Sequence, residues 1–283
     1  AGALKGNLLS RAMNEDDMAR VIAEFVRGAE MCREAGFDAV ELHMGHGYLL
    51  NQFISPLSNR RSDRYGGSAV NRVRFPARVL GAVKQAVGQD LAVLAKISVA
   101  DGVRRGTQVE DSIVTARELE AAGADMLVLS GGRNVESTWY MFGSRMNRLE
   151  ISKVLKSQGE RVTALMMKAA AASEPAVQFR EMYFLENSRQ IRAAVDLPLA
   201  YVGGSKSLAN AEQAVAEGFD CVVMARALIH DPALVNKFQS GEVTQSGCDN
   251  CNGCVAYIYH PDGTWCVRNP PNDPALNRIA AAD

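Results

Sequence analysis

One phrase occurs three times along the chain and constrains its fold more than any other feature. The three copies begin at Glu34, Ala121 and Ala216 and read EAGFDAVEL, AAGADMLVL and AEGFDCVVM. Each copy reads as the end of a helix, a closing glycine, a two-residue turn and a short buried strand. A helix that leads this quickly into a buried strand is half of a repeating βα unit, so the phrase predicts a parallel sheet with flanking helices.

Two more apolar runs, at residues 91–97 and 197–202, read as buried strands and bring the predicted strands to five. Helical spacing of apolar residues predicts a first helix that begins after Asn14, which can cap it, and ends at Gly36. The other predicted helices span residues 75–87, 109–122, 184–194 and 208–216.

Two parallel folds fit this pattern, an open doubly wound sheet and a closed barrel. No Gly-x-Gly-x-x-Gly follows a predicted strand, which counts against the open dinucleotide-binding fold. Polar or glycine residues stand at the ends of four of the strands: Lys96 closes the second, and residues 130–132, 203–204 and 225–226 close the third, fourth and fifth. Functional groups at one end of several strands are typical of a barrel, so we predict an α/β protein with the TIM (β/α)8 barrel fold.

A complete barrel needs eight βα units in about 250 residues, whereas this sequence shows five. We therefore expect a truncated barrel of about five units, over residues 1–245. The segment 133–180 separates the third and fourth strands, and its amphipathic stretch 151–172 suits a lid over the strand ends. An insertion that merely packs on the rim is the alternative. Residues 246–283 form a predicted C-terminal extension that carries a cluster of cysteines.

The composition excludes several classes of protein. An apolar content of 47% supports one sizeable core, and a net charge of −1 gives no excess that would favour nucleic acid or a membrane surface as a partner. The sequence has no run of eighteen apolar residues and no basic segment followed by an apolar one at its start. We expect a cytoplasmic protein that acts on a small molecule, and we leave open whether it forms a homo-oligomer.

Three polar rings follow the predicted strand at residues 39–42. His43, His46 and Tyr48 are separated by glycines that let the backbone turn sharply. Two imidazoles suit the binding of an oxygen that develops negative charge, and a phenol beside them suits proton donation. Ordinary core histidines or metal-ligating histidines are the alternatives.

A second group of candidates can bind an anion. Gly203 and Gly204 offer backbone N–H groups at the end of one strand, and Ala225 and Arg226 follow the next, as in barrels that bind phosphate after strands seven and eight. A plain turn with a surface ion pair is the alternative. Lys96 lies inside an apolar run, so its ammonium needs a partner, for which Asp101 and Glu41 are candidates.

The six cysteines fall into two groups. Cys32 and Cys221 lie within apolar patterns and are interpreted as core residues. The other four have the spacing C-x-x-C-x-x-C followed by eleven residues and a fourth cysteine; they are Cys248, Cys251, Cys254 and Cys266. Such a set suits an iron–sulfur cubane, with a zinc site or free thiols as alternatives.

The run HMGHGYLLNQFISPLSNRRSDRYGGS at residues 43–68, with Asn71-Arg72 after it, resembles the signature of the old yellow enzyme family of FMN-dependent NADH:flavin oxidoreductases. The likeness extends from about Asn14 almost to the C-terminus. It matches the fourth to eighth strands of the family's barrel, and so implies that this barrel is truncated on its N-terminal side. It implies that His43 and His46 hold the carbonyl or nitro oxygen of an electron-poor alkene above the flavin, and that Tyr48 donates the proton. The charged residues between 59 and 72 would be scaffold.

The resemblance also implies the cofactors. The anion at Gly203, Gly204, Ala225 and Arg226 would be the FMN phosphate, and NAD(P)H would be the co-substrate. Lys96 would face the pyrimidine edge of the flavin, where the family more often has arginine, a residue that makes the two-pronged contact a lysine cannot make. The cysteine cluster resembles the iron–sulfur branch of the family, which includes trimethylamine dehydrogenases and dienoyl-CoA reductases, and so implies a [4Fe-4S] cluster.

These expectations combine into one function. We expect an FMN-dependent NAD(P)H oxidoreductase that transfers hydride through FMN to an activated alkene or a related electron-poor substrate. The alternatives are an iron–sulfur flavoprotein dehydrogenase that acts on amines, and a non-catalytic truncated remnant with a metal-binding cysteine module.

Overall fold

A computed structural model of the chain describes residues 11–170, 175–258, 260–261 and 263–270. The chain divides into two compact units. The first comprises Ala1–Met141, Phe184–Val202 and Val215–Val222, and the second comprises Phe142–Tyr183, Gly203–Ala214 and Val223–Asp283. Residues 171–172 of the predicted amphipathic stretch and 271–283 of the predicted extension lie outside the described residues. The predicted domain boundary at residue 245 stays a prediction.

The strands form one sheet in which neighbours follow the order of the chain, β1-β2-β3-β4-β5. They are β1 (Ala39–Met44), β2 (Ala92–Ser98), β3 (Met126–Ser130), β4 (Leu199–Val202) and β5 (Cys221–Val223). The first four pair in parallel, with His43 opposite Lys96 and Ser98 opposite Ser130. A doubly wound sheet reverses its strand order at a switch point, whereas a barrel keeps the order of the chain. The described strands therefore confirm α/β units of the TIM-barrel type.

Helices alternate with these strands as the sequence predicts. The first unit contains α1 (Glu15–Glu34), α2 (Leu49–Ile54), α3 (Ala69–Val87), α4 (Val109–Ala121), α5 (Thr138–Phe142, whose last residue falls in the second unit) and α8 (Leu185–Arg192). Asn14 caps α1 as predicted, since its Oδ1 accepts from the Asp17 N–H at 2.9 Å. Ser68 caps α3 and starts it six residues before the predicted position. No helix of the described ranges is long and apolar enough to cross a membrane.

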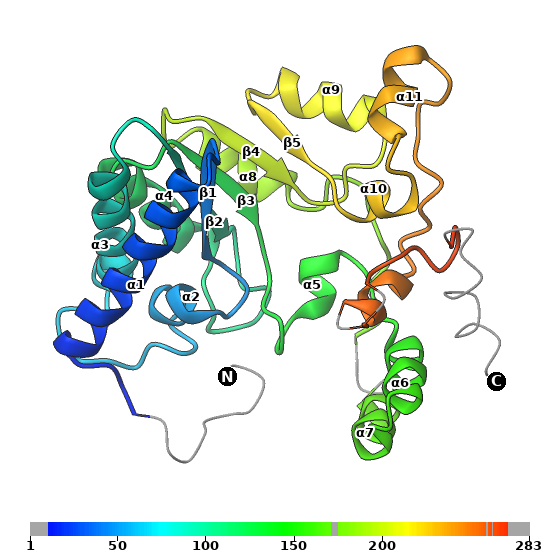
Figure 1. Ribbon diagram of the computed structural model, residues 1–283, viewed down its shortest axis with the longest axis horizontal. Helices are drawn as coiled ribbons and strands as arrows, with labels where there is room; N and C mark the ends of the chain where they lie inside the picture. Colours follow the sequence, from blue (N-terminus) through cyan, green and yellow to red (C-terminus); the bar gives the residue numbers. More distant parts are fainter. Residues whose placement is uncertain (1–10, 171–174, 259, 262, 271–283) are drawn as a thin grey trace. The chain divides into compact units, whose positions relative to one another are not determined.

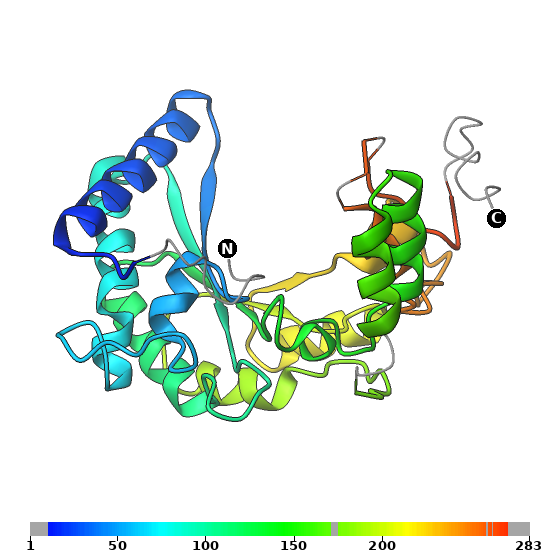
Figure 2. The same cartoon turned by 90° about the horizontal axis from the view of Figure 1, so that it is seen from below.

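The sheet of the first unit has two different faces. The helices α1, α3 and α4 pack side by side along one face (Figures 1 and 2). Val93, Ala95 and Ile97 of β2 point toward these helices and are at most 1% exposed. The alternate residues Leu94 and Lys96 are only partly buried, because side chains of a strand alternate between the two faces. Polar side chains therefore stand on the face that these helices do not cover.

The second unit joins the insertion to the cysteine segment. Its helices are α6 (Arg148–Ser157), α7 (Arg161–Ala170), α9 (Leu208–Ala216, which continues into the first unit), α10 (Arg226–His230), α11 (Leu234–Ser240) and the 3-10 helix η2 (Gly253–Tyr257). The predicted single amphipathic stretch is two helices, because Gly159 adopts a left-handed backbone between them. The helix α6 packs against η2 through a small core of Val154, Tyr257 and Trp265.

Two cysteine predictions are wrong. Cys221 is exposed, and Cys32 is only partly buried. Cys221 begins β5, the last strand of the described sheet, and no residue of that strand is buried. An apolar run at the edge of a sheet looks the same in sequence as one at its centre, which explains the error.

Candidate functional site

The three predicted rings lie together at the end of β1. His43 belongs to the strand, His46 lies in the loop that follows, and Tyr48 precedes the first turn of α2. The ring centroid of His43 is 5.0 Å from that of His46 and 5.0 Å from that of Tyr48. Tyr48 is 47% exposed, so its phenol is accessible to a small molecule. This ring cluster can place two hydrogen-bonding imidazoles and one acid around the same substrate atom.

His46 is held at the ends of three strands. Its backbone is left-handed, with φ at 60°, which is uncommon for a residue other than glycine. The His46 N–H donates to Ser98 Oγ at 3.2 Å, and Nε2 lies 2.8 Å from Ser130 Oγ. Since Ser98 ends β2 and Ser130 ends β3, the carboxyl ends of β1, β2 and β3 meet at this imidazole.

Both imidazoles of the ring cluster are neutral near pH 7. Burial lowers the pKa of His46 to about 3, and the nearby His43 and Lys96 lower it further. Burial also lowers the pKa of His43, with Lys96 acting in the same direction and Glu41 opposing it. In the part of the chain that the structure describes, no group of three or more His, Cys, Asp or Glu is arranged to hold a metal ion. A neutral imidazole keeps one N–H donor, so each ring of this pair can donate a hydrogen bond.

Lys96 has a carboxylate partner. Its Nζ lies 2.6 Å from Glu41 Oε1, and the two side chains are 25% and 34% exposed. Of the two partners considered from the sequence, the structure selects Glu41, because Asp101 is engaged elsewhere. Lys96 also faces His43 in the strand register, so a positive charge stands beside the ring cluster.

The predicted anion-binding residues lie in the second unit, which we describe by itself. Gly203 and Gly204 follow β4 with φ values of 135° and 80°, and a Cβ on Gly204 would lie 2.9 Å from the Tyr183 ring. Only glycine suits this backbone and this close packing. Arg226 follows Ala225 and donates to the Phe142 carbonyl at 2.8 Å and to Asn252 Oδ1 at 2.7 Å. These contacts differ from those of a simple surface ion pair.

The cysteine segment also belongs to the second unit. Cys248, Cys254 and Cys266 are buried and Cys251 is partly buried, all four as free thiols. Burial raises the pKa of Cys254 to about 11, and the other three cysteines add to the rise while Arg226 opposes it. The other three thiols therefore lie close enough to Cys254 to affect its pKa. Their donor chemistry fits an iron–sulfur cluster or zinc, although the described residues are not arranged around a metal position.

The contacts that hold His46 were not found from the sequence, although Ser130 was noted as a strand-end residue and Asp101 as a possible partner of Lys96. Ser98 and Ser130 contact His46, and Asn51, Asp101 and Arg133 form a buried network behind it. The one available signal was position, because each serine directly follows the apolar run of a predicted strand. Nothing in the local sequence pairs Arg133 with Asn51, 82 residues earlier in the chain.

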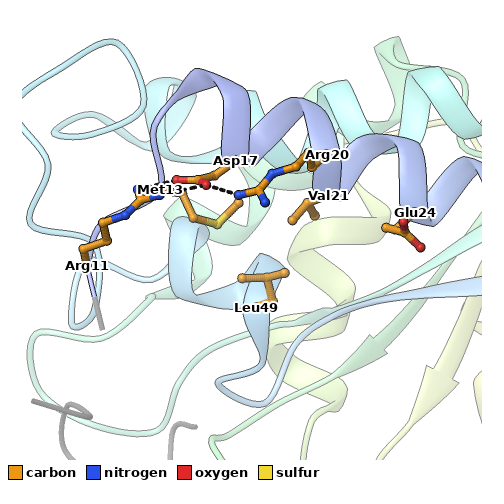
Figure 3. A pocket seen from close by; sticks show the side chains of 7 residues that line it. All are labelled: Arg11, Met13, Asp17, Arg20, Val21, Glu24 and Leu49. Carbon is orange, nitrogen blue, oxygen red and sulfur yellow. Dashed lines mark hydrogen bonds and ion pairs between the residues drawn. The ribbon is translucent and has the colours of Figure 1, made fainter. Parts of the chain in front are cut away.

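A cavity of about 550 Å³ lies beside the first turns of α1 (Figure 3). It is lined by Arg11, Met13, Asp17, Arg20, Val21, Glu24 and Leu49. Arg11 and Arg20 both donate to the carboxylate of Asp17, which neutralises part of their charge. Neither imidazole of the ring cluster lines this cavity, so we do not assign the chemistry to it.

The chain matches known proteins along most of its length. Residues 3–140 match the model of the NADH:flavin oxidoreductase / NADH oxidase family. The chain is 40% identical over 267 residues to 4,4'-dithiodibutanoate disulfide reductase of Rhodococcus erythropolis, covering 94% of this chain and 64% of that protein. The chain thus spans less than two thirds of the length of this relative.

Two solved structures share the fold. A 2-naphthoyl-CoA reductase in complex with 2-naphthoyl-CoA superposes with a TM-score of 0.71 at 25% identity, over 92% of this chain and 35% of that chain. The old yellow enzyme homologue from Zymomonas mobilis superposes with a TM-score of 0.60 at 20% identity, over 94% of this chain and 61% of that chain.

Parallel βα units in chain order, with a cluster of rings at their carboxyl ends, define a protein of the TIM-barrel class. The family match agrees with the resemblance of residues 43–68, and the structural likeness agrees with the predicted fold. Residues 3–140 of the chain are thus similar to the NADH:flavin oxidoreductase / NADH oxidase family, and the chain shares the fold of an old yellow enzyme homologue.

Proposed function

We propose that the chain is the part of an FMN-dependent NAD(P)H oxidoreductase that binds and protonates an activated alkene or a related electron-poor acceptor. The observation that carries this proposal is the ring cluster at the end of β1, in which the centroid of the neutral His43 ring lies 5.0 Å from that of the neutral His46 ring and 5.0 Å from that of the accessible Tyr48 phenol. The family match supports a flavin and a nicotinamide as the redox partners.

The residues of the second unit fit the phosphate of FMN. Gly203 and Gly204 both have positive φ values, a backbone that glycine adopts readily and that can turn peptide N–H groups toward an anion. Ala225 and Arg226 would add a guanidinium, and Lys96 of the first unit would oppose negative charge on the flavin ring. Bound FMN would supply hydride transfer between NAD(P)H and the substrate.

The imidazoles would polarise the substrate. When the Ser130 hydroxyl donates to His46 Nε2, the proton of this neutral ring is on Nδ1, which is then free to donate to a substrate oxygen. His43 would donate a second hydrogen bond to the same oxygen. These donors bind best where negative charge develops, so they stabilise the transition state more than the bound substrate.

Tyr48 would supply the proton that completes the reduction. We expect Tyr48→Phe to leave flavin reduction by the nicotinamide unchanged and to slow flavin reoxidation by an enone by about 10²- to 10⁴-fold, the usual contribution of a general acid. Stopped-flow absorbance at the flavin band measures both half-reactions. Equal slowing of the two half-reactions would contradict the role given to Tyr48.

The acceptor class can be tested directly. The Rhodococcus relative is a disulfide reductase, so a disulfide is a second candidate acceptor beside an enone. In that case hydride would add to one sulfur, and the other would leave as a thiolate that Tyr48 protonates. Consumption of NAD(P)H with an enone and with a dicarboxylate disulfide, measured with wild type and Tyr48→Phe, distinguishes the two substrates.

A second proposal concerns the cysteine segment. Because four thiols are neighbours in one unit and three of them are buried, we propose that Cys248, Cys251, Cys254 and Cys266 bind a metal, with a [4Fe-4S] cluster preferred over zinc. Iron and acid-labile sulfide should each approach four per chain in anaerobically purified protein and should fall in Cys254→Ser. Zinc without iron would favour the tetrahedral zinc site, and the absence of both metals would favour free thiols.

The same preparation tests the remaining functions. An iron–sulfur dehydrogenase that acts on amines would show reduction of both flavin and cluster by an amine without any nicotinamide. A non-catalytic remnant would bind no flavin, so its visible spectrum would lack flavin bands even after incubation with FMN.

A further inference from the structure

Asp101 is a buried carboxylate in the loop after β2. It is 0% exposed, and its Oδ2 accepts hydrogen bonds from Ser55 Oγ and from the Thr107 N–H, the latter at 2.8 Å. Among the described residues its Oδ1 has no hydrogen-bond partner. Arg133 Nη1 lies 3.9 Å from Oδ2 and is the cation of this site. A buried carboxylate without a nearby cation would be strongly unfavourable, so the two charges depend on each other.

Arg133 connects this carboxylate to the ring cluster. Its side chain is 5% exposed and donates from Nη1 to Asn51 Oδ1 at 3.2 Å. The same oxygen of Asn51 accepts the Gly47 N–H at 2.9 Å. The guanidinium is therefore one hydrogen-bonded side chain away from the residue that follows His46.

Backbone hydrogen bonds also connect the loops that carry His46, Arg133 and Asp101. Residues His46 and Arg133 form a parallel bridge, and the Asn134 N–H donates to the His46 carbonyl at 3.0 Å. Ser137 Oγ accepts the Arg133 N–H at 2.8 Å and donates to the Asp101 carbonyl. The loops after β1, β2 and β3 are thus joined to one another at His46.

His46 needs such a support. A histidine at a φ of 60° is strained, and a strained backbone persists only where its surroundings determine it fully. We propose that Asp101 and Arg133 are positioning residues for His46, which keep its ring against Ser130 and its free nitrogen toward the substrate. This proposal rests on the proposed function, in which His46 donates a hydrogen bond to the activating oxygen of the substrate.

The proposal differs from a purely structural role in what it predicts for the imidazole. If the network merely stabilises the fold, a folded variant without it keeps His46 in place. If it positions His46, the ring leaves Ser130 and becomes more exposed, so its pKa rises from about 3 toward the ordinary value of 6.5. The charged and titratable groups around the ring, His43, Lys96 and Glu41, are unchanged in either case.

The test uses the full chain labelled with ¹⁵N-histidine. In wild type we expect no titration of His46 between pH 5 and 8 and a single tautomer. Arg133→Gln leaves a buried carboxylate unpaired and can unfold the chain, so the deciding variant is Asp101→Asn/Arg133→Gln, which removes both charges. In this variant His46 should titrate within that range, with its pKa raised by at least two units. A folded double variant with the wild-type His46 signals overturns the proposal.

A matched control and a kinetic measurement complete the test. Arg74→Gln removes an exposed arginine of the same unit that contacts only Arg64 and Asn71 among the hydrogen bonds of the described residues, and it should leave His46 unchanged. We expect the double variant to slow enone reduction about 10²-fold, the effect of a misplacement of about 1 Å, with flavin reduction unaffected.

Arg133→Lys separates charge balance from geometry. A lysine keeps the positive charge beside Asp101 but cannot contact Asn51 and Glu136 together, as the guanidinium does. Full recovery of enone reduction by Arg133→Lys would overturn the positioning role. If wild type reduces no alkene at all, the proposed function fails, and the titration of His46 still decides whether the network positions the ring.

Discussion

The depressed pKa of His46 predicts how stability changes with pH. Burial lowers this pKa to about 3 in the folded chain, whereas the unfolded chain keeps the ordinary value of 6.5. The unfolded state therefore binds the proton more tightly, and stability falls as the pH drops below 6.5. The contribution of His46 is complete above pH 6.5 and is lost progressively down to about pH 3.

The size of the effect follows from the two pKa values. At pH 5 the unfolded imidazole is about 1.5 pH units below its pKa while the folded imidazole is still neutral. At about 1.4 kcal/mol per unit, the free energy of unfolding at pH 5 is about 2 kcal/mol lower than at pH 7.5 because of His46 alone. His43, whose pKa is also lowered, acts in the same direction.

Urea denaturation of wild type and His46→Gln at pH 7.5 and pH 5 measures this contribution. Glutamine does not titrate, so the variant should lose about 2 kcal/mol less stability than wild type between the two pH values. Any constant change caused by the substitution cancels in this comparison. Equal losses in the two proteins would refute the burial of a neutral imidazole at this position.

Three further predictions concern the scaffold. Arg72 is 6% exposed and donates to Asp111 at 2.6 Å, so Arg72→Met should lower the free energy of unfolding by about 3 kcal/mol, measured by urea denaturation. A Cβ on Gly66 would lie 2.0 Å from the Arg61 carbonyl oxygen, so Gly66→Ala should lower the melting temperature by about 5 °C or more, or prevent folding. A Cβ on Gly28 in α1 meets nothing within 4 Å, so Gly28→Ala should raise stability by about 0.5–1 kcal/mol; a loss would contradict its helical setting.

The fold was predictable because its signals are local. The repeated phrase ends each helix with a glycine and starts a strand two residues later, and those short-range preferences hold at β1, β3 and β5. The six-residue helix α2 was missed because it is too short to show a helical period and has no side-chain cap. Side-chain partners on neighbouring strands were harder to predict, since only the strand register shows that Lys96 pairs with Glu41 rather than with Asp101.

The rings of the candidate site were predictable, but their support was not. His43, His46 and Tyr48 lie within six residues, directly after a strand, where barrel sites occur. Ser130 and Arg133 reach His46 from more than 80 residues away, and neither belongs to a motif. Contacts between strand-end loops depend on tertiary structure, which a single sequence does not encode in any local pattern.

The packing of α6 against η2 has a consequence for the exchange of segments between relatives. Tyr257 and Trp265 form a common core with Val154, and the Tyr257 hydroxyl donates to Glu150 at 3.0 Å. In a chimaera, the helices α6 and α7 at residues 148–170 would be replaced by those of a relative. The rings of Tyr257 and Trp265, which are close in sequence to the cysteines, would then lose the apolar side chain that covers them. The helix pair α6–α7 and the cysteine segment therefore have to be exchanged together, although about a hundred residues of the chain separate Val154 from Tyr257.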